Sequence, residues 1–185
     1  MAHDKFGKYQ FLILSIFFLS IGLGSCMKDA DKKKHMTKTE LKKYDKSLEA
    51  ANRYLTTLDA ERIDSYAKRR NWDMIVTKSG LWYQVYEHGK GPKAKEGQVA
   101  VLNFKISLLD GTLCYTSDSL GTKEFAIGHG GVESGLEEGI LLLKVGDKAR
   151  FIMPPYKAHG LLGDMNKIPA RSIIIYEIEL LKLID

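Results

Sequence analysis

The sequence predicts an α+β fold, in which a mostly antiparallel β-sheet wraps around one short α-helix and a longer helix precedes the sheet. Three observations support this prediction. Apolar residues recur every three or four positions over residues 37–66, as on one face of a helix. From residue 79 onward the apolar segments are short, aromatic or β-branched, and separated by glycine and proline, which is typical of strands. Only residues 134–144 interrupt them with a second helical pattern.

Residues 1–25 predict a lipoprotein signal peptide. Two lysines precede an apolar run at residues 10–23, which is too short to predict a membrane-spanning helix. Two small residues and Cys26 follow, and this order resembles the bacterial lipobox, in which the cysteine is acylated. The alternative is an ordinary signal peptide with an incidental cysteine, but exported chains rarely leave an unpaired cysteine at the cleavage point. We therefore expect Cys26 to anchor a lipoprotein of the cell envelope, in the outer membrane, facing the periplasm or the surface.

The positive charge is concentrated beside this expected anchor. The formal net charge is +5; residues 27–75 hold 13 basic and 9 acidic side chains, whereas residues 76–185 hold 13 of each. A nucleic-acid-binding domain would carry the excess on the domain itself, so we expect no nucleic-acid partner. Residues 26–36 predict a flexible tether, whose lysines face either anionic headgroups or solvent alone.

Residues 37–75 predict a helical extension before the domain. Thr37 and Glu40 have the spacing of a capping box, in which each residue satisfies a free N–H of the other at a helix start. The helix is expected to run to about Tyr66, with an apolar stripe formed by Leu41, Tyr44, Leu48, Ala51, Leu55 and Leu58. This stripe either packs on the chain's own domain or pairs with a second copy, giving a homodimer through residues 37–66.

Three strands are predicted before the second helix, at residues 81–86, 99–109 and 123–127. Asp110-Gly111 follows the longest of them and favours a hairpin turn. The glycine-rich residues 128–131 lack the Lys-Ser/Thr pair of a phosphate-binding loop, so we expect them to form a turn into the helix.

The second helix and two further strands complete the predicted domain. Ser134 and Glu137 form a second capping-box pattern. The helix is expected to continue to about Lys144, with an apolar face of Leu136, Ile140 and Leu143. The remaining elements are a strand at 149–153, a long loop at 156–171 and a closing strand at 172–183.

The common catalytic motifs are absent from the sequence. It contains no Gly-x-Ser-x-Gly, no Walker loop and no His-Glu-x-x-His. The five histidines show no metal-ligand spacing, so we expect neither a metal nor a cofactor. If Cys26 carries lipid, Cys114 has no disulfide partner. A covalent or metal-dependent enzyme is therefore disfavoured.

The order of the short motifs from residue 80 onward resembles that of an FKBP-type peptidyl-prolyl isomerase domain. The resemblance rests on Gly80-Leu-x-Tyr83, Gly91-Pro92, Leu109-Asp110-Gly111-Thr112, Phe125-x-Ile-Gly128, Val132 to Gly139, Val145 to Ala149, Met153-Pro154-Pro155, Tyr156 to Gly160, Lys167-Ile168-Pro169 and Glu177 to Leu181. It covers residues 76–185, which we expect to form an FKBP-type domain. With the lipobox and the helical lead-in, the chain most closely resembles the gliding-motility-associated FKBP-like lipoproteins.

The resemblance implies a shallow apolar pocket between the curled sheet and its helix, where rotation about an Xaa-Pro bond takes place. The barrier to that rotation is roughly 18–20 kcal/mol and comes from amide resonance. A dry pocket disfavours the planar, charge-separated amide and can hold the twisted form without a nucleophile. The positions that match the family's site are Phe104, Tyr115, Val132, Glu133 (through its backbone N–H), Leu136, His159, Ile168 and Tyr176.

Several of these positions depart from the family pattern. Cys114-Tyr115 stands where the family has Phe-Asp, so we expect an aromatic wall and the pocket carboxylate to be missing, unless Asp118 reaches back. Leu136 replaces the tryptophan of many members, which leaves a deeper floor. His159 replaces a tyrosine and keeps the capacity to donate a hydrogen bond.

Three functions follow from these expectations. The preferred one is a prolyl isomerase that assists the folding of exported proteins at the cell envelope and acts on unfolded, proline-containing polypeptides. The second is a peptide-binding chaperone or assembly factor that uses the same pocket with little turnover. The third is a structural lipoprotein that uses the fold as a surface contact, since a fold does not fix a function.

Overall fold

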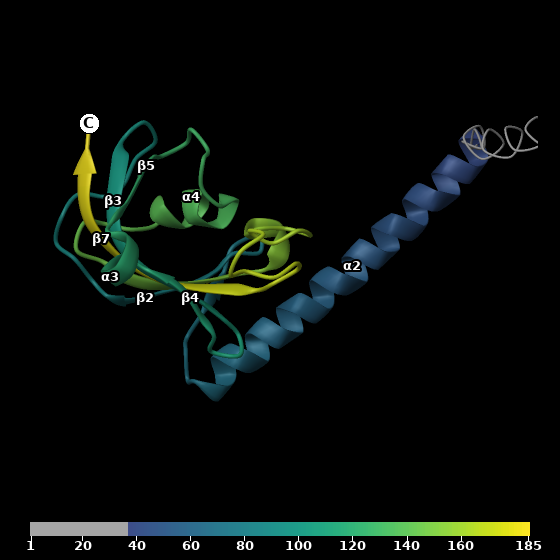
Figure 1. The fold of residues 1–185 in the computed structure, drawn as a ribbon, viewed down its shortest axis with the longest axis horizontal. Coiled ribbons are helices and arrows are strands. Elements are labelled where there is room, and N and C mark those ends of the chain that lie inside the picture. Colours follow the sequence, from purple (N-terminus) through teal and green to yellow (C-terminus); the bar gives the residue numbers. More distant parts are fainter. Residues whose placement is uncertain (1–36) are drawn as a thin grey trace, which may run out of the picture. The chain divides into compact units, whose positions relative to one another are not determined.

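The computed structural model describes residues 37–185; the expected signal peptide, Cys26 and the tether lie outside the described residues. The chain divides into two units, with the boundary between Leu48 and Glu49. This boundary falls inside the long helix α2, Lys38–Arg69 (Figure 1). Among the described residues, no helix is sufficiently long and apolar to cross a membrane.

The capping box at the start of α2 is confirmed. The Thr37 N–H donates to Glu40 Oε2 at 2.9 Å, and the Glu40 N–H donates to Thr37 Oγ1 at 3.3 Å. The helix ends at Arg69, three residues after the expected end, with Lys68 and Arg69 in its last turn. Basic side chains are favourable there because the helix dipole is negative at its C-terminus.

The expected apolar stripe of α2 is covered only in part: Leu55 and Leu58 are half-buried, and the preceding members are exposed. Leu41, Tyr44 and Leu48, in the first unit, are exposed. In the second unit, Ile63 and Tyr66 are buried in one cluster with residues of the sheet. Packing on the chain's own domain therefore holds for the last turns of the helix, which use a different set of residues from the predicted stripe.

The second unit contains one seven-stranded antiparallel sheet, which confirms the predicted fold class. Its strand order is β1-β2-β6-β7-β3-β4, and β5 also pairs with β3. The strands are β1 (Ile75–Val76), β2 (Trp82–Glu87), β3 (Val99–Leu108), β4 (Leu113–Thr116), β5 (Lys123–Ala126), β6 (Lys148–Met153) and β7 (Ile174–Ile184). Strands β1 and β4 and the short helix α3, Ser117–Leu120, were not predicted from the sequence.

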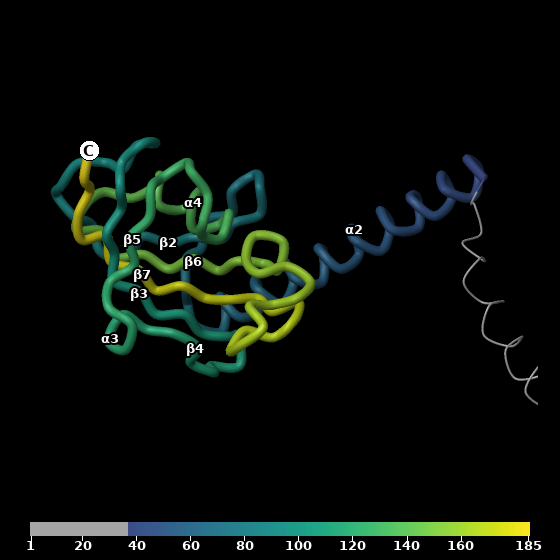
Figure 2. The backbone as a smooth tube through the Cα atoms, turned by 45° about the horizontal axis from the view of Figure 1, so that its top comes forward, coloured from purple at the N-terminus to yellow at the C-terminus, as the bar shows by residue number. Residues whose placement is uncertain are grey.

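Strand β3 organises the sheet. One edge pairs with β7 along its whole length, from Val99 opposite Ile184 to Leu108 opposite Ile174. The other edge is shared, because β5 pairs with residues 99–102 and β4 pairs with residues 105–107. Figure 2 shows β5 and β4 following one another along β3, with α3 between them. The expected turn at residues 110–111 is confirmed by the Gly111 N–H bonded to the Leu108 carbonyl at 3.0 Å.

The two faces of the sheet carry separate cores. On the face that holds helix α4 (Ser134–Ile140), β7 contributes Tyr176, Ile178 and Leu180 to the larger cluster. Ile173 and Ile175 belong to the second cluster, which includes Ile63 and Tyr66 of α2. This division follows from the alternation of side chains along a strand.

A part-buried ion pair also ties α2 to the loop before β7. Arg171 Nη2 lies 2.7 Å from Asp59 Oδ2, and the Asp59 side chain is only 7% exposed. A carboxylate on the buried face of a helix is costly unless it is paired, so this contact compensates the burial of Asp59.

Helix α4 begins and ends differently from the prediction. Its N-cap is Glu133, without a side-chain cap, so the capping box predicted from Ser134 and Glu137 is wrong. The Glu137 carboxylate instead accepts the Gly128 and Gly130 N–H groups, at 2.8 and 2.9 Å. The helix also stops at Ile140 instead of about Lys144. The predicted apolar face is confirmed, because Leu136, Ile140 and Leu143 are all fully buried.

Two glycines let α4 lie close to β6. A Cβ atom at Gly139 would stand 2.4 Å from the Phe151 ring, and one at Gly135 would stand 2.7 Å from Met153 Sδ. Any larger residue would push the helix away from the sheet. This close packing holds the loop before α4 above the sheet.

Candidate functional site

A hollow of about 400 Å³ lies between the start of β5, the loop before α4 and the loop after β6. We call it the site hollow. It is lined by Lys123, Gly131, Val132, Glu133, Ala158 and His159. Three of the eight residues predicted for the site, Val132, Glu133 and His159, are therefore part of its wall.

Four other predicted residues form an apolar floor behind this wall. Phe104 of β3, Leu136 of α4, Ile168 and Tyr176 of β7 are buried in one cluster, and Val132 and Ala158 pack against it. The Phe104 and Tyr176 rings lie 6.3 Å apart between centroids and are tilted by 43°. We call Phe104, Leu136, Ile168 and Tyr176 the floor.

A chain of polar contacts runs across the floor. Lys123 Nζ donates to the Tyr176 hydroxyl at 3.0 Å, and that hydroxyl donates to Glu133 Oε1 at 2.9 Å. His159 Nε2 lies 3.1 Å from the same oxygen, although its N–H is not aligned for a hydrogen bond. Burial and the neighbouring Glu133 carboxylate raise the pKa of Tyr176, which keeps its hydroxyl protonated and able to donate.

The walls of the site hollow therefore differ from the expected hydrocarbon and aromatic lining. Lys123 Nζ stands 5.4 Å from the centroid of the Phe104 ring and 5.6 Å from that of Tyr176, so an ammonium group covers the rings of the floor. The Glu133 side chain is 7% exposed, and only its backbone had been expected to matter. The carboxylate of the family's Phe-Asp pair is absent at residues 114–115, and Glu133 brings a carboxylate to the pocket from a different position.

Tyr115, the eighth predicted residue, braces a neighbouring loop instead of lining the site hollow. Its hydroxyl donates to Asp164 Oδ2. Asp164 Oδ1 also accepts the N–H groups of Asn166 and Ile168, at 2.9 and 2.8 Å. Burial favours the neutral acid, but these hydrogen bonds outweigh it and hold the pKa of Asp164 below its usual range. The brace fixes the segment that places Ile168 in the floor.

Two further expectations concerned the residues beside Tyr115. Cys114 is buried, with its thiol 3.6 Å from the Lys167 carbonyl, and burial raises the pKa of this thiol. Asp118 is exposed on α3. Within residues 37–185 no hydrogen bond or ion pair joins Asp118 to the site, so it does not replace the expected carboxylate.

Lys123 is a polar residue of the wall that was not predicted from the sequence. It is the first residue of β5, and it directly precedes the Phe125-x-Ile-Gly128 motif. Alternation along the strand puts Lys123 and the buried Phe125 on the same face, and this was the available signal.

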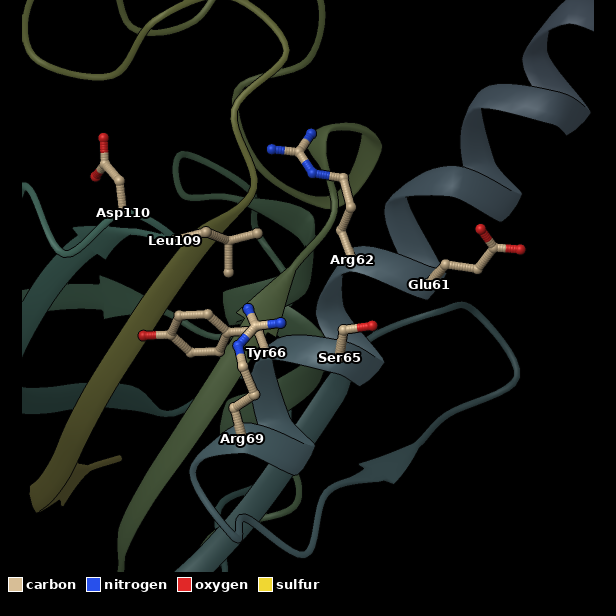
Figure 3. A pocket seen from close by; sticks show the side chains of 7 residues that line it. All are labelled: Glu61, Arg62, Ser65, Tyr66, Arg69, Leu109 and Asp110. Carbon is tan, nitrogen blue, oxygen red and sulfur yellow. The ribbon is translucent and has the colours of Figure 1, made fainter.

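A larger hollow of about 500 Å³ lies elsewhere, between the end of α2 and the turn after β3. Figure 3 shows that Arg62, Tyr66 and Arg69 come from the helix, whereas Leu109 and Asp110 come from the turn. None of the predicted site residues lines it, and its apolar lining residues Tyr66 and Leu109 belong to the second hydrophobic cluster. In the described part of the chain, no group of three or more His, Cys, Asp or Glu residues could hold a metal ion.

Comparisons with known proteins connect this geometry to a family. Residues 91–181 match the family described as FKBP-type peptidyl-prolyl cis-trans isomerase, and this range contains the wall and floor of the site. The FKBP-type peptidyl-prolyl cis-trans isomerase FkpA of Escherichia coli (strain K12) is 33% identical over 118 residues, which are 64% of this chain and 42% of FkpA. Peptidyl-prolyl cis-trans isomerase FKBP9 of Rattus norvegicus is 34% identical over 93 residues, 50% of this chain and 16% of FKBP9. The chain therefore spans less than half the length of these relatives.

Solved structures show the same fold. The crystal structure of FkpA from Escherichia coli is similar with a TM-score of 0.58 and 25% identity, covering 96% of this chain and 82% of that one. The crystal structure of AtFKBP13 has the same TM-score with 29% identity, and covers 60% of this chain and 98% of that one.

Proposed function

Because residues 91–181 form a domain of the FKBP-type peptidyl-prolyl cis-trans isomerase family, we propose that this protein isomerises Xaa-Pro bonds in polypeptides. The observation that carries the proposal is the apolar floor beneath the site hollow. The four floor side chains are 0–7% exposed and none of them lines the hollow, so they form a water-poor surface for a proline ring only when the wall above them moves.

The reaction requires no reactive group. The planar amide gains its stability from charge separation between the carbonyl oxygen and the nitrogen, which water favours and a dry surface does not. Bound against the floor, the bond loses part of that stabilisation, and the twisted form becomes easier to reach. The Glu133 N–H, which no acceptor takes within residues 37–185, is available to a carbonyl of the substrate.

Lys123 must move for the proline ring to reach the floor. Its side chain is 25% exposed, whereas that of Glu133 is 7% exposed, so Lys123 is the more mobile member of the pair. When the lysine swings outward, the Tyr176 hydroxyl still donates to the Glu133 carboxylate and stabilises its charge.

A peptide-binding chaperone with little turnover is the second candidate. The polar wall favours it, because Lys123 competes with the substrate for the floor. A neighbouring loop favours it too, since Leu161, Leu162 and Met165 are 72%, 78% and 90% exposed and offer apolar contacts to an unfolded chain.

A protease-coupled assay on a short Xaa-Pro peptide separates the two candidates. We expect the full chain to accelerate isomerisation, the Ile168→Ala variant to lose most of this acceleration, and the exposed control Leu120→Ala to keep it. A rate equal to that in buffer, with binding of an unfolded protein retained, would leave only the chaperone.

We propose that the protein acts in the cell envelope, attached to the outer membrane by lipid on Cys26. The proposal rests on the signal segment and lipobox in the sequence. Labelling cells with a palmitate analogue tests it: Cys26→Ser should abolish the label and release the protein from the membrane fraction, whereas Cys114→Ser should keep both. A label that survives Cys26→Ser would refute the anchor.

We also propose a role in gliding motility. This proposal rests on the resemblance of the sequence to the gliding-motility-associated FKBP-like lipoproteins, and loss of gliding after gene deletion would support it.

We also propose that residues 37–66 pair two copies into a homodimer. The exposed Leu41, Tyr44 and Leu48 support this, because pairing would remove their apolar surface from water. Sedimentation should give a dimer for the chain and a monomer for a Leu41→Glu, Leu48→Glu variant. A monomeric wild type would end the proposal.

A further inference from the structure

We propose that Glu133 determines substrate specificity: its carboxylate receives a basic side chain of the polypeptide, so the site prefers arginine or lysine adjacent to the proline. The proposal deepens the isomerase function and rests on it, because it names the substrate class of the same site. It follows from two observations. One oxygen of the buried Glu133 carboxylate accepts no hydrogen bond from the described residues, and the ammonium group that lies beside it, that of Lys123, also covers the floor.

The two oxygens of the Glu133 carboxylate have different surroundings. Oε1 accepts the Tyr176 hydroxyl at 2.9 Å. Oε2 is buried and accepts no hydrogen bond within residues 37–185, although the residue lines the site hollow. The side chain is only 7% exposed, and a carboxylate removed from water is costly unless donors or a cation compensate it. Oε2 is therefore able to accept one further donor from a molecule in the hollow.

Lys123 supplies the compensating charge in this structure. Its Nζ lies 3.8 Å from Glu133 Oε2, which is within ion-pair distance but too far for a hydrogen bond. The same Nζ donates to the Tyr176 hydroxyl at 3.0 Å and stands 5.4 Å from the centroid of the Phe104 ring. The ammonium group that neutralises Glu133 is thus the group that blocks the floor.

A proline ring that reaches the floor displaces this ammonium group. Glu133 then keeps the Tyr176 hydroxyl but loses its neighbouring cation, and this loss opposes binding. A substrate with a basic side chain beside the proline brings a replacement cation to Oε2, whereas a neutral substrate brings none. An acidic side chain adds a second negative charge beside Glu133. The expected order of preference is therefore basic, then neutral, then acidic.

The other charged side chains near the hollow do not reverse this order. His159 Nε2 lies 3.1 Å from Glu133 Oε1, so it does not take the position at Oε2. Lys157 is paired with Glu138 at 2.9 Å. The displaced Lys123, already 25% exposed, moves toward water, where its repulsion of a bound cation is weakened. Since the new ion pair stays partly solvated, the preference should be modest, about two- to fivefold.

The test compares peptides of the same shape and different charge. The full chain is assayed with Arg-Pro, citrulline-Pro and Glu-Pro tetrapeptides and with the Pro-Arg and Pro-citrulline pair, because citrulline resembles arginine without its charge. NMR exchange measures isomerisation without a protease that would cut the basic peptides, and titration measures equilibrium binding. We expect kcat/KM for the better arginine peptide to exceed that of its citrulline match about two- to fivefold at low salt. The ratio should shrink as salt is added.

Three variants locate the effect. Glu133→Gln keeps the shape of the side chain and removes its charge, so the arginine and citrulline peptides should become equal. Lys123→Met keeps an apolar stem over the rings and removes the internal cation, so the preference for arginine should exceed that of the wild type. Glu124→Gln, at the exposed neighbour of Lys123 on β5, should keep the wild-type ratio. Thermal unfolding shows which variants are folded, and Lys123→Met decides the matter if Glu133→Gln is not.

Three results would overturn the proposal: a wild-type protein that does not favour arginine over citrulline on either side of the proline, an arginine preference that survives Glu133→Gln, or a folded Lys123→Met variant with no larger preference than the wild type. A protein that isomerises no peptide would refute the proposed function instead. In that case the binding ratios alone still decide whether basic neighbours are preferred.

Discussion

The floor and the wall of the site are built by different forces. The floor residues are part of the main hydrophobic cluster, so the same contacts stabilise the domain and form the substrate surface. The wall residues Lys123, Glu133 and His159 are positioned by a few polar contacts around one hydroxyl group. The difference teaches that floor substitutions should lower stability and activity together, whereas wall substitutions should change activity and specificity with little loss of stability.

The largest effect is expected in the floor. Leu136→Ala removes a fully buried side chain between α4 and the sheet and should lower the free energy of unfolding by about 2–5 kcal/mol. Urea denaturation measures this loss. A loss as small as that of the exposed control Leu120→Ala would show that the floor is not part of the core.

The close contact between α4 and β6 should give the next largest effect. Gly139→Ala places a methyl group against the Phe151 ring and should cost about 1–3 kcal/mol. Phe151→Leu makes room for the new methyl group. In a double-mutant cycle, the double variant should therefore lose less free energy of unfolding than the sum of the losses of the two single variants. Strictly additive losses would contradict the steric explanation.

A smaller effect is expected where the floor meets the wall. Tyr176→Phe keeps the ring and removes only the hydroxyl that joins Lys123 to Glu133. It should lower the free energy of unfolding by about 1.5 kcal/mol, the low end for a hydrogen bond to a charged group, and change kcat/KM for an Xaa-Pro peptide. An unchanged kcat/KM would show that this hydroxyl does not organise the wall.

The smallest effect is expected for the hydrogen bond between Tyr115 and Asp164, as a shift in the pH dependence of the free energy of unfolding. Because the folded-state pKa of Asp164 is depressed, its contribution to stability is present above its unfolded pKa and is lost as pH falls through the folded value. Tyr115→Phe removes one of the hydrogen bonds that depress this pKa. The variant should therefore begin to lose stability at a higher pH than the wild type as the solution is acidified. Urea midpoints measured from neutral pH down to about pH 3, below the usual carboxyl pKa, follow the shift. Identical acid profiles for the two proteins would refute the role of the brace.

The floor could be predicted from the sequence because burial depends on residue type and strand alternation. Phe104 and Tyr176 are apolar or aromatic residues inside long strands, and their motifs resemble those of a known family. The wall could be predicted only in part. The family resemblance indicated Glu133 and His159 but not Lys123, because the position of a lysine side chain depends on partners distant in sequence. Lys123 reaches Tyr176, 53 residues away, and no local pattern indicates that contact.

The failed capping box has a similar cause. Ser134 and Glu137 have the correct spacing, but Gly128 and Gly130 present free N–H groups to the same carboxylate. A loop that folds back over the helix start therefore outcompetes the local motif. At Thr37 and Glu40, where the structure shows this reciprocal pair at the helix start, the same pattern forms its expected bonds.

The central claim is that a proline bond rotates over an apolar floor without proton transfer or a covalent step. The solvent isotope effect on isomerisation tests it most directly. The account predicts the same kcat/KM in H₂O and in D₂O, because no proton moves in the rate-limiting twist. A rate lower by a factor of about two or more in D₂O would indicate general acid–base catalysis by a wall residue and contradict the account.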